Sequence, residues 1–249
     1  MKVIIITGAS SGIGKATTIL FADSNYQVIA MGRNEEVLNE IRKCYPKNVQ
    51  TICADFTDIT DDIISKISKC LESIDNANLR YIVNCAATAE PFLPLTSVSR
   101  SDLRKIFELN VIFPINLLQC VSKYLSKWLT PNFGSRFLFI GSSYDTSNPS
   151  LSDAFHPGLT GSYAISKTAL RTAVEYLKFE IKSCQTMPAI GYYNPGATST
   201  PMYDKFISKM EAEKILANWT PTQPEKIAEL IKFKLESTNI EEFSNFDNN

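Results

Sequence analysis

The sequence MKVIIITGASSGIG, residues 1–14, runs from an apolar, β-branched stretch directly into three closely spaced glycines. The apolar run predicts a buried strand over residues 2–7, and the periodicity after it predicts a helix over residues 13–22. The glycines therefore lie where a strand meets a helix N-terminus, with backbone N–H groups and the positive end of the helix dipole facing outward. Because glycine has no Cβ, a pyrophosphate can approach this backbone closely. The stretch predicts a dinucleotide-binding turn, against the alternative of a glycine-rich turn without a ligand. The turn residues assigned to the cofactor are Gly8, Ser10, Ser11, Gly12, Ile13 and Gly14.

The rest of the chain repeats this strand-then-helix pattern. Further strands are expected over residues 27–31, 49–54, 80–85, 135–142, 189–193 and 242–246. Helices are expected over residues 35–44, 61–74, 101–128, 163–182 and 224–235, with a kink at Pro114. Repeated units of this kind with right-handed crossovers predict an α/β fold, in which a doubly wound parallel sheet is flanked by helices. Ligands of such a sheet bind outside the carboxyl ends of its strands.

Length and composition restrict the class of protein. The chain has 249 residues, 44% of them hydrophobic, and 25 Lys and Arg against 26 Asp and Glu. We expect a single domain over residues 1–249, since α/β units of this length often fold as one. There is no basic run for nucleic acid, and no apolar stretch reaches the roughly 20 residues of a membrane span or forms a signal-peptide core. The six cysteines are scattered and the one histidine has no companion, so we expect no metal, no disulfide and a cytoplasmic location.

The end of the second expected strand reads Ala-Met-Gly-Arg-Asn, residues 30–34. Proteins that bind NAD usually place an acidic residue here, which holds the ribose 2′-hydroxyl. In this chain Gly32 and Arg33 occupy the position, and a guanidinium suits the 2′-phosphate of NADP better than a hydroxyl. The pattern predicts NADPH, with Arg33 and its neighbour Asn34 among the cofactor contacts. The alternative is that Arg33 is a solvated residue at a helix start. Asp55, after the third strand, is expected either to accept from the adenine amino group or to cap a turn.

Tyr163 and Lys167 lie four residues apart at the start of an expected helix, so their side chains share one face. An ammonium near a phenol lowers the pKa of the phenol from about 10, and a tyrosine with a lowered pKa acts as a general acid or base. This spacing alone occurs by chance in many helices. Ser142 and Ser143, however, end the fifth strand at the same edge of the sheet. A serine hydroxyl there can bind a carbonyl oxygen beside the phenol and polarise it for hydride attack, although two such serines are also common in plain turns.

Six motifs, in this order and spacing, resemble the short-chain dehydrogenase/reductase family. They are TGASSGIG (7–14), NCAA (84–87), LNV (109–111), GSS (141–143), YAISK (163–167) and NPGATST (194–200). The resemblance covers nearly the whole chain. It implies a single-domain Rossmann fold with a seven-stranded sheet, and hydride transfer between NAD(P) and a CH–OH or C=O group.

The resemblance also implies roles for individual residues. Tyr163 is the expected general acid/base, Ser143 the carbonyl anchor, and Lys167 the group that lowers the pKa of the phenol and binds the nicotinamide ribose. Asn110 is expected to hold a water that relays protons to Lys167. Supporting cofactor contacts are expected from Asn84, Pro195, Gly196, Thr198 and Thr200.

Within the family, the compact length and Arg33 resemble NADPH-dependent carbonyl reductases of the sepiapterin reductase and benzil reductase type. The expected partner is then a small ketone, dicarbonyl or pterin-like substrate. Two alternatives stay open: an NAD(P)-linked alcohol or steroid dehydrogenase working in the oxidative direction, and a nucleotide-binding sensor or scaffold without turnover. The family commonly forms dimers and tetramers through its long helices, which implies a homodimer or homotetramer here.

Several segments depart from the family pattern or surround the site. The segment 144–162 is longer than usual, so we expect an insertion beside the active site. The final segment, residues 242–249, lacks the glycines that usually frame the last strand. Residues 201–220 have the length of a closing lid, with an ordinary surface helix as the alternative. The side chains expected at the rim of the substrate pocket are Phe92, Tyr144, Phe155, Tyr193, Met202, Tyr203 and Phe206.

Overall fold

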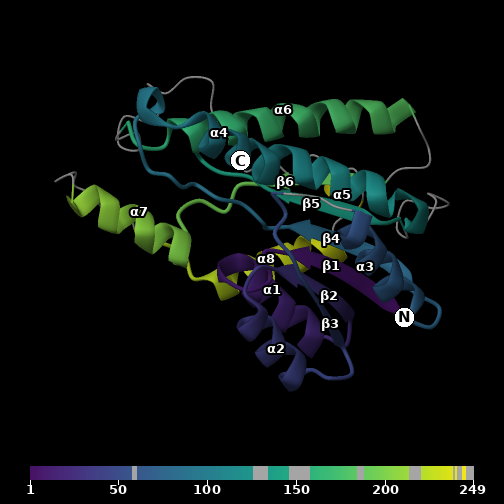
Figure 1. Ribbon diagram of the computed structural model, residues 1–249. Coiled ribbons are helices and arrows are strands. Elements are labelled where there is room, and N and C mark those ends of the chain that lie inside the picture. Colours follow the sequence, from purple (N-terminus) through teal and green to yellow (C-terminus); the bar gives the residue numbers. More distant parts are fainter. Residues whose placement is uncertain are drawn as a thin grey trace.

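A parallel β-sheet with helices on both faces forms the centre of the structure (Figure 1). The computed structural model describes residues 1–57, 61–125, 134–145, 158–183, 188–212, 220–237, 239 and 243–244. Among these residues, six strands pair in the order β3-β2-β1-β4-β5-β6. Their bounds are β1 (Lys2–Thr7), β2 (Gln27–Gly32), β3 (Val49–Cys53), β4 (Asn78–Asn84), β5 (Arg136–Ile140) and β6 (Ala189–Tyr193).

The strand order places a switch in direction between β1 and β4. From β1 the chain steps outward to β2 and β3, then returns to the other side of β1 and steps outward through β4, β5 and β6. The loops after β1 and β4 therefore diverge to opposite sides, which opens a crevice at the carboxyl edge of the sheet. The doubly wound parallel sheet predicted from the sequence is confirmed.

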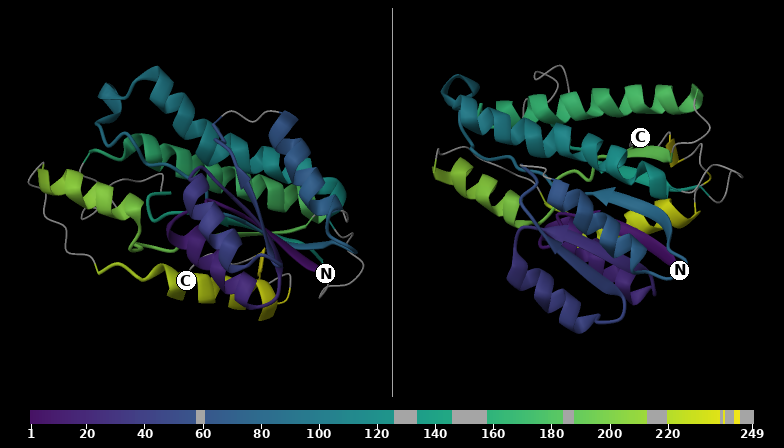
Figure 2. Two further views of the ribbon diagram at one scale, coloured as in Figure 1. Left: turned by 60° about the horizontal axis from the view of Figure 1, so that its bottom comes forward. Right: turned by 45° about the vertical axis from the view of Figure 1, so that its right-hand side comes forward.

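Helices cover both faces because the strands are apolar throughout. The residues Val3 to Ile6 of β1 have no exposed surface, as expected of a parallel sheet without a solvent face. On one face, a core cluster packs the sheet against α3 (Asp61–Glu72), α5 (Phe113–Val121) and α6 (Gly161–Ser183). On the other face lie α1 (Gly12–Asp23), α2 (Glu35–Cys44) and α8 (Pro224–Ser237) (Figure 2). None of the described helices is long and apolar enough to cross a bilayer.

The helix expected over residues 101–128 is divided. It consists of α4 (Arg100–Phe107), a π-helical turn η2 (Glu108–Ile112) and α5. Asn110, in the π turn, accepts a hydrogen bond from the Thr88 backbone N–H at 2.9 Å and donates one to the Thr88 carbonyl at 2.8 Å. Pro114 follows in the first turn of α5, where a missing N–H costs little. The distortion expected at Pro114 therefore begins six residues earlier, at Glu108, and serves the Asn110 contact.

The seventh strand expected over residues 242–246 is wrong for the part of the chain described here. Phe243 and Ser244, the described residues of that segment, are helical, and the sheet ends at β6. Phe243 is fully buried, and its ring fills the space beside Gly191 of β6, where an added Cβ would lie 2.8 Å from the ring. The segment thus packs a side chain against the sheet instead of extending it.

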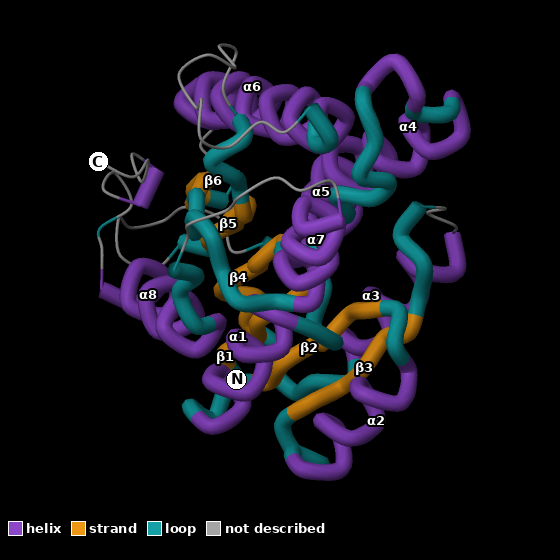
Figure 3. The backbone as a smooth tube through the Cα atoms, turned by 90° about the vertical axis from the view of Figure 1, so that its left-hand side faces the viewer, coloured by secondary structure: helices purple, strands orange, loops and turns teal. Residues whose placement is uncertain are grey.

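The segment expected as a lid or a surface helix forms α7 (Pro201–Ala212), and residues 213–219 lie outside the described residues. Figure 3 shows α7 in front of the sheet, on the side where the strands end. Phe206 and Met210 are the buried side chains of α7. An ion pair of 2.6 Å between Lys205 Nζ and Glu90 Oε1 joins α7 to the segment after β4.

Candidate active site

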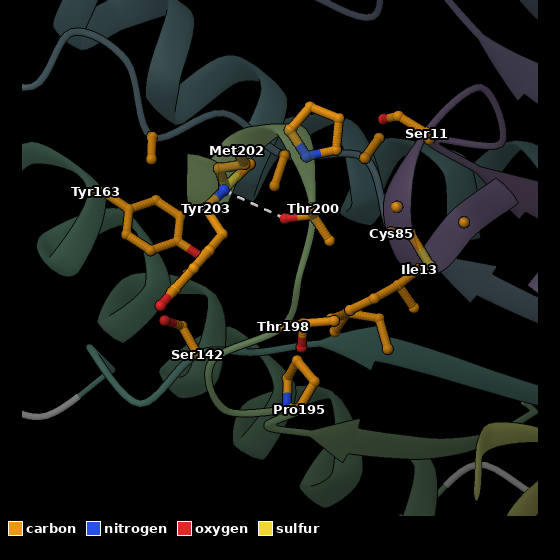
Figure 4. A pocket seen from close by; sticks show the side chains of 18 of the residues that line it. Ser11, Ile13, Cys85, Ser142, Tyr163, Pro195, Thr198, Thr200, Met202 and Tyr203 are labelled. Carbon is orange, nitrogen blue, oxygen red and sulfur yellow. Dashed lines mark hydrogen bonds between the residues drawn. The ribbon is translucent and has the colours of Figure 1, made fainter. Parts of the chain in front are cut away.

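A cavity lies at the carboxyl edge of the sheet (Figure 4). Its walls come from the ends of β1 to β6 and from the first turns of α6 and α7. The predicted site residues that line it are Gly8, Ser10, Ser11, Gly12, Ile13, Gly14, Arg33, Ser143, Tyr163, Lys167, Pro195, Gly196, Thr198 and Thr200. Four predicted residues lie outside this lining, namely Asn34, Asp55, Asn84 and Asn110.

The turn after β1 is shaped by its glycines. Gly8 has a φ of +66° and Gly12 a φ of +49°, a backbone conformation that side chains disfavour. A Cβ on Gly14 would lie 2.3 Å from the carbonyl oxygen of Gly8, so only glycine lets α1 begin this close to the end of β1. Ser11 precedes α1 and makes no capping hydrogen bond with its side chain, so the first N–H groups of the helix are available to a ligand. The residues of this turn fit the pyrophosphate of a dinucleotide.

The loop after β6 completes this half of the cavity. Thr200 lies against the glycine turn, because a Cβ on Gly12 would come within 2.8 Å of its Cγ2 atom. Its hydroxyl accepts a hydrogen bond from the Tyr203 backbone N–H at 3.2 Å, drawn in Figure 4. Gly196 has a φ of +66°, and a Cβ there would meet nothing within 4 Å. This loop therefore leaves open space beside it, as the flat nicotinamide ring of a dinucleotide requires.

Of the three cofactor contacts predicted after β2 and β3, one lines the cavity and two make local hydrogen bonds in their own turns. Arg33 lines the cavity and is exposed. Asn34 instead caps α2, since its Oδ1 accepts from the Val37 N–H at 3.1 Å. Asp55 accepts from both the backbone N–H and the hydroxyl of Thr57, at 3.0 and 2.9 Å. The Thr57 backbone hydrogen bond holds the pKa of Asp55 below its usual value. The structure thus favours the turn role for Asp55 and gives Asn34 a capping role.

Asn84 and Asn110 support the cavity from behind. Asn84 is buried at the end of β4, where its Oδ1 accepts from the Thr7 hydroxyl at 2.9 Å and so ties β1 to β4. Asn110 is also buried, and its Nδ2 donates to Ser166 Oγ at 2.9 Å. Ser166 precedes Lys167 on α6, so the π turn of Asn110 fixes the helix that carries the lysine. The water relay expected at Asn110 stays a prediction.

Tyr163 and Lys167 lie one turn apart on α6, and both line the cavity. The Lys167 Nζ atom is 5.7 Å from the centre of the Tyr163 ring, and it donates to the Ile140 carbonyl at 2.9 Å. Lys167 is 2% exposed, so its ammonium is held at the end of β5 rather than in solvent. The spacing of the two residues in the sequence correctly predicts that they face the same cavity.

The ionisation of this pair is set mainly by burial. Burial raises the pKa of Tyr163 to about 12, while a hydrogen bond with Ser142 acts in the opposite direction. Burial also lowers the pKa of Lys167 to about 8. We expected the lysine to lower the pKa of the phenol. In the structure its ammonium is engaged by Ile140, and the phenol stays protonated at neutral pH.

Ser142, rather than the expected Ser143, lies beside the phenol. Ser142 is 8% exposed, forms the hydrogen bond with Tyr163, and accepts from the Tyr144 N–H at 3.2 Å. Figure 4 shows its hydroxyl facing the same hollow as Tyr163. Ser143 also lines the cavity but is exposed to solvent. Both serines expected at this place thus line the cavity, and the role of Ser143 as carbonyl anchor stays a prediction.

An aromatic wall leads away from Tyr163. The Tyr144 ring lies 6.1 Å from that of Tyr163, Phe206 lies 6.3 Å from Tyr144, and Phe92 lies 5.5 Å from Phe206. Met202 and Tyr203 of α7 line the same cavity, so five of the seven expected rim residues are in place.

Of the two other expected rim residues, one lies away from the cavity and one is outside the described residues. Tyr193 is 6% exposed and packs in the core on the α1 face of the sheet, because alternate strand residues point to opposite faces. Phe155 lies outside the described residues, as does most of the segment expected as an insertion.

Sequence reasoning missed several residues of the cavity wall, among them Thr160 and Cys85. Thr160 is 2% exposed, and its hydroxyl has no hydrogen-bond partner among the described residues. Its only signal was its position one helical turn before Tyr163. Cys85 also lines the cavity, and burial raises the pKa of its thiol to about 12, so it is a small apolar wall residue rather than a nucleophile.

A family model described as short chain dehydrogenase matches residues 2–211. The chain is 25% identical over 240 residues to the uncharacterized oxidoreductase YxnA of Bacillus subtilis, an alignment that covers 94% of this chain and 63% of YxnA. It is 24% identical over 258 residues to the benzil reductase ((S)-benzoin forming) of Bacillus cereus, with 95% of each chain covered. The chain thus spans less than two thirds of YxnA but nearly all of the benzil reductase.

Solved structures share the fold. A short chain dehydrogenase from Shigella flexneri complexed with NADP is similar with a TM-score of 0.74 and 20% identity, covering 98% of this chain and 93% of that one. A 4-hydroxyisoleucine dehydrogenase complexed with NADH has a TM-score of 0.74 and 21% identity, covering 95% and 92%. At these identities the likeness shows the architecture alone. The family model, which spans most of the chain, shows more: the protein belongs to the short-chain dehydrogenase family.

Proposed function

We propose that this protein reduces a small, uncharged carbonyl compound with NADPH. The observation that carries the proposal is that Tyr163, Lys167 and Ser142 line the same cavity as the glycine turn after β1. A bound nicotinamide supplies the hydride to the carbonyl carbon. The residues of the chain act on the carbonyl oxygen: Ser142 donates a hydrogen bond to it, and Tyr163 donates the proton as the alkoxide forms. Lys167 holds the cofactor ribose and positions the phenol.

The protonation of Tyr163 favours the reductive direction. A phenol with a pKa of about 12 carries its proton at neutral pH, ready for donation to an alkoxide. Oxidation of an alcohol needs the phenolate instead, and burial opposes its formation here. The alcohol or steroid dehydrogenase alternative therefore depends on the positive charge of an oxidised nicotinamide, whereas reduction does not.

The choice of NADPH rests on Arg33. No carboxylate follows β2 at Gly32, and Arg33 lies on the cavity wall, where its guanidinium can bind a 2′-phosphate. The similar Shigella protein holds NADP and the 4-hydroxyisoleucine dehydrogenase holds NADH, so this fold accepts either cofactor and the local side chain decides.

The aromatic wall points to an uncharged aromatic ketone or dicarbonyl. The charged residues among those lining the cavity are Arg33 and Lys167, and both belong to the cofactor side. The Thr160 hydroxyl lies one turn from Tyr163 and suits a second oxygen on the substrate, because a buried hydroxyl is stabilised by a partner. The name of the Bacillus cereus relative, benzil reductase, points to the same class of compound.

The test measures NADPH oxidation with benzil, with the aliphatic dicarbonyl 2,3-butanedione and with the charged keto acid pyruvate, and uses NADH as the cofactor control. We expect turnover that is highest with benzil, low with pyruvate and weaker with NADH. Tyr163→Phe should abolish turnover and leave NADPH binding within a few fold. NADPH binding without turnover on any of these carbonyls would contradict the proposal and favour the sensor or scaffold alternative.

The proposal includes self-association as a homodimer or homotetramer. Tyr176 and Phe179 of α6 are 66% and 74% exposed, an unusual exposure for aromatic side chains of a monomer. Light scattering on the purified chain measures its mass, and a monomer at micromolar concentration would contradict this part.

A further inference from the structure

Asp145 is a buried carboxylate that follows Tyr144 of the cavity wall and takes no part in the chemistry proposed above. It is 7% exposed. The Tyr192 hydroxyl donates a hydrogen bond to its Oδ2, and Arg171 Nη1 lies 3.1 Å from its Oδ1. Arg171 belongs to α6 and Tyr192 to β6, so Asp145 ties the turn after β5 to a helix residue 26 positions later and a strand residue 47 positions later. Arg171 follows Lys167 by four residues, on the same face of α6.

The same contacts fix the backbone that carries Ser142. The Asp145 N–H donates to the Ser142 carbonyl at 3.1 Å, which closes a turn between the two residues. Gly141 precedes this turn, and a Cβ on it would lie 2.2 Å from the Tyr192 ring. The glycine thus lets the ring pass next to the end of β5 and reach the carboxylate. A displacement of Asp145 would move Ser142 with it.

The charge of Asp145 also acts on the reacting pair. It raises the pKa of Tyr163 and that of Lys167. Charges in a partly dehydrated site interact more strongly than in water. The other titratable or charged groups around the pair are Cys85 after β4, Tyr144 after β5, Tyr192 of β6 and Arg171 of α6. Arg171 opposes the carboxylate, so the two together set the local charge.

We propose that Asp145 is a positioning residue of the reductase site: its carboxylate, clamped by Tyr192 and Arg171, holds the Ser142 turn and supplies the negative charge that acts on Tyr163 and Lys167. The inference rests on the proposed function for its effect on catalysis, but its electrostatic part concerns Lys167 in the free protein as well.

Two variants should move the ionisation in opposite directions. Asp145→Asn keeps the shape and removes the negative charge, so the titration midpoint of Lys167 should fall by about one pH unit. Arg171→Ala leaves the carboxylate without its counter-charge, so the midpoint should rise by a similar amount. Arg171 has a side chain that is 45% exposed, which makes this variant tolerable for folding and keeps the test open if Asp145→Asn does not fold. Lys178→Ala is the matched control, because it removes the same charge from α6 about 10 Å farther along the helix.

The midpoint is read by NMR from lysine labelled with ¹³C at Cε, with the Lys167 signal identified by its loss in Lys167→Arg. The pH at which kcat for benzil reduction falls to half should shift with it. Lys167 midpoints that do not move, or that move in the same direction in both variants, would overturn the proposal. A purely structural clamp does not distinguish removal of a negative charge from removal of a positive one. A wild-type protein that is inactive but shows the opposite shifts would refute the reductase function and leave the electrostatic role of Asp145 standing.

Discussion

Replacement of Ser142 and Ser143 by alanine, one at a time, tests which hydroxyl binds the substrate oxygen. Ser142 is buried and hydrogen-bonded to Tyr163, whereas Ser143 is exposed. Loss of one preoriented donor to a developing oxyanion lowers kcat by a factor of about 10² to 10³. We therefore expect a loss of this size in Ser142→Ala and less than about threefold in Ser143→Ala, since the exposed hydroxyl adds little to a dehydrated site.

Stability and cofactor binding separate this effect from a folding defect. Ser142→Ala also removes the acceptor of the Tyr144 N–H, a hydrogen bond of 3.2 Å worth about 0.5–1.5 kcal/mol. The melting temperature should therefore fall by a few degrees, and NADPH affinity, measured by fluorescence titration, should stay within a few fold. An equal or larger loss of kcat in Ser143→Ala would refute the assignment of Ser142.

Three further predictions concern the cofactor side of the cavity. Arg33→Ala should lower the preference for NADPH over NADH, as the ratio of kcat/KM values, by about tenfold, the lower end for a charge-assisted hydrogen bond because Arg33 is exposed. Arg42→Ala, in the last turn of α2 and outside the cavity, should leave the ratio unchanged, and an unchanged ratio in Arg33→Ala would contradict the phosphate contact. Gly14→Ala should destabilise the fold by about 1–3 kcal/mol and weaken NADPH binding, because the new Cβ meets the Gly8 carbonyl at 2.3 Å; wild-type affinity in a titration would show that the turn is not the phosphate site. Lys167, with its pKa lowered to about 8, acts in its charged form, so kcat for reduction should fall as the pH rises through about 8; a profile that stays flat to pH 10 would contradict its role.

Local sequence patterns specify much of this fold. The strands expected over 2–7 and 189–193 and the helix over 35–44 have the observed bounds, because continuous apolar runs and a capping Asn34 mark their ends locally. The π turn at Asn110 has no such signal. It depends on hydrogen bonds to Thr88, which a sequence pattern does not record.

The sequence predicts the candidate site where the spacing of residues along a helix determines it. It does not predict the site where the choice lies between two adjacent residues of a turn. Tyr163 and Lys167 share a helix face by their spacing, whatever surrounds them. Ser142 and Ser143 are chemically identical neighbours, and only the turn after β5 decides which one meets the phenol. The clamp of Asp145 joins residues 145, 171 and 192, so it becomes visible only when β6 and α6 are packed together.

Transfer of isotope from cofactor to product tests the central claim most directly. Two samples of NADPH, each with deuterium on one face of C4 of the nicotinamide, are incubated separately with the protein and benzil. The deuterium content of the product is measured by mass spectrometry. We predict that only one of the two labelled cofactors transfers its deuterium to the carbinol carbon of the product. Tyr163→Phe should bind the same cofactor without forming labelled product. A product without deuterium from either face, or a Tyr163→Phe protein that forms it at the wild-type rate, would contradict hydride transfer assisted by this phenol.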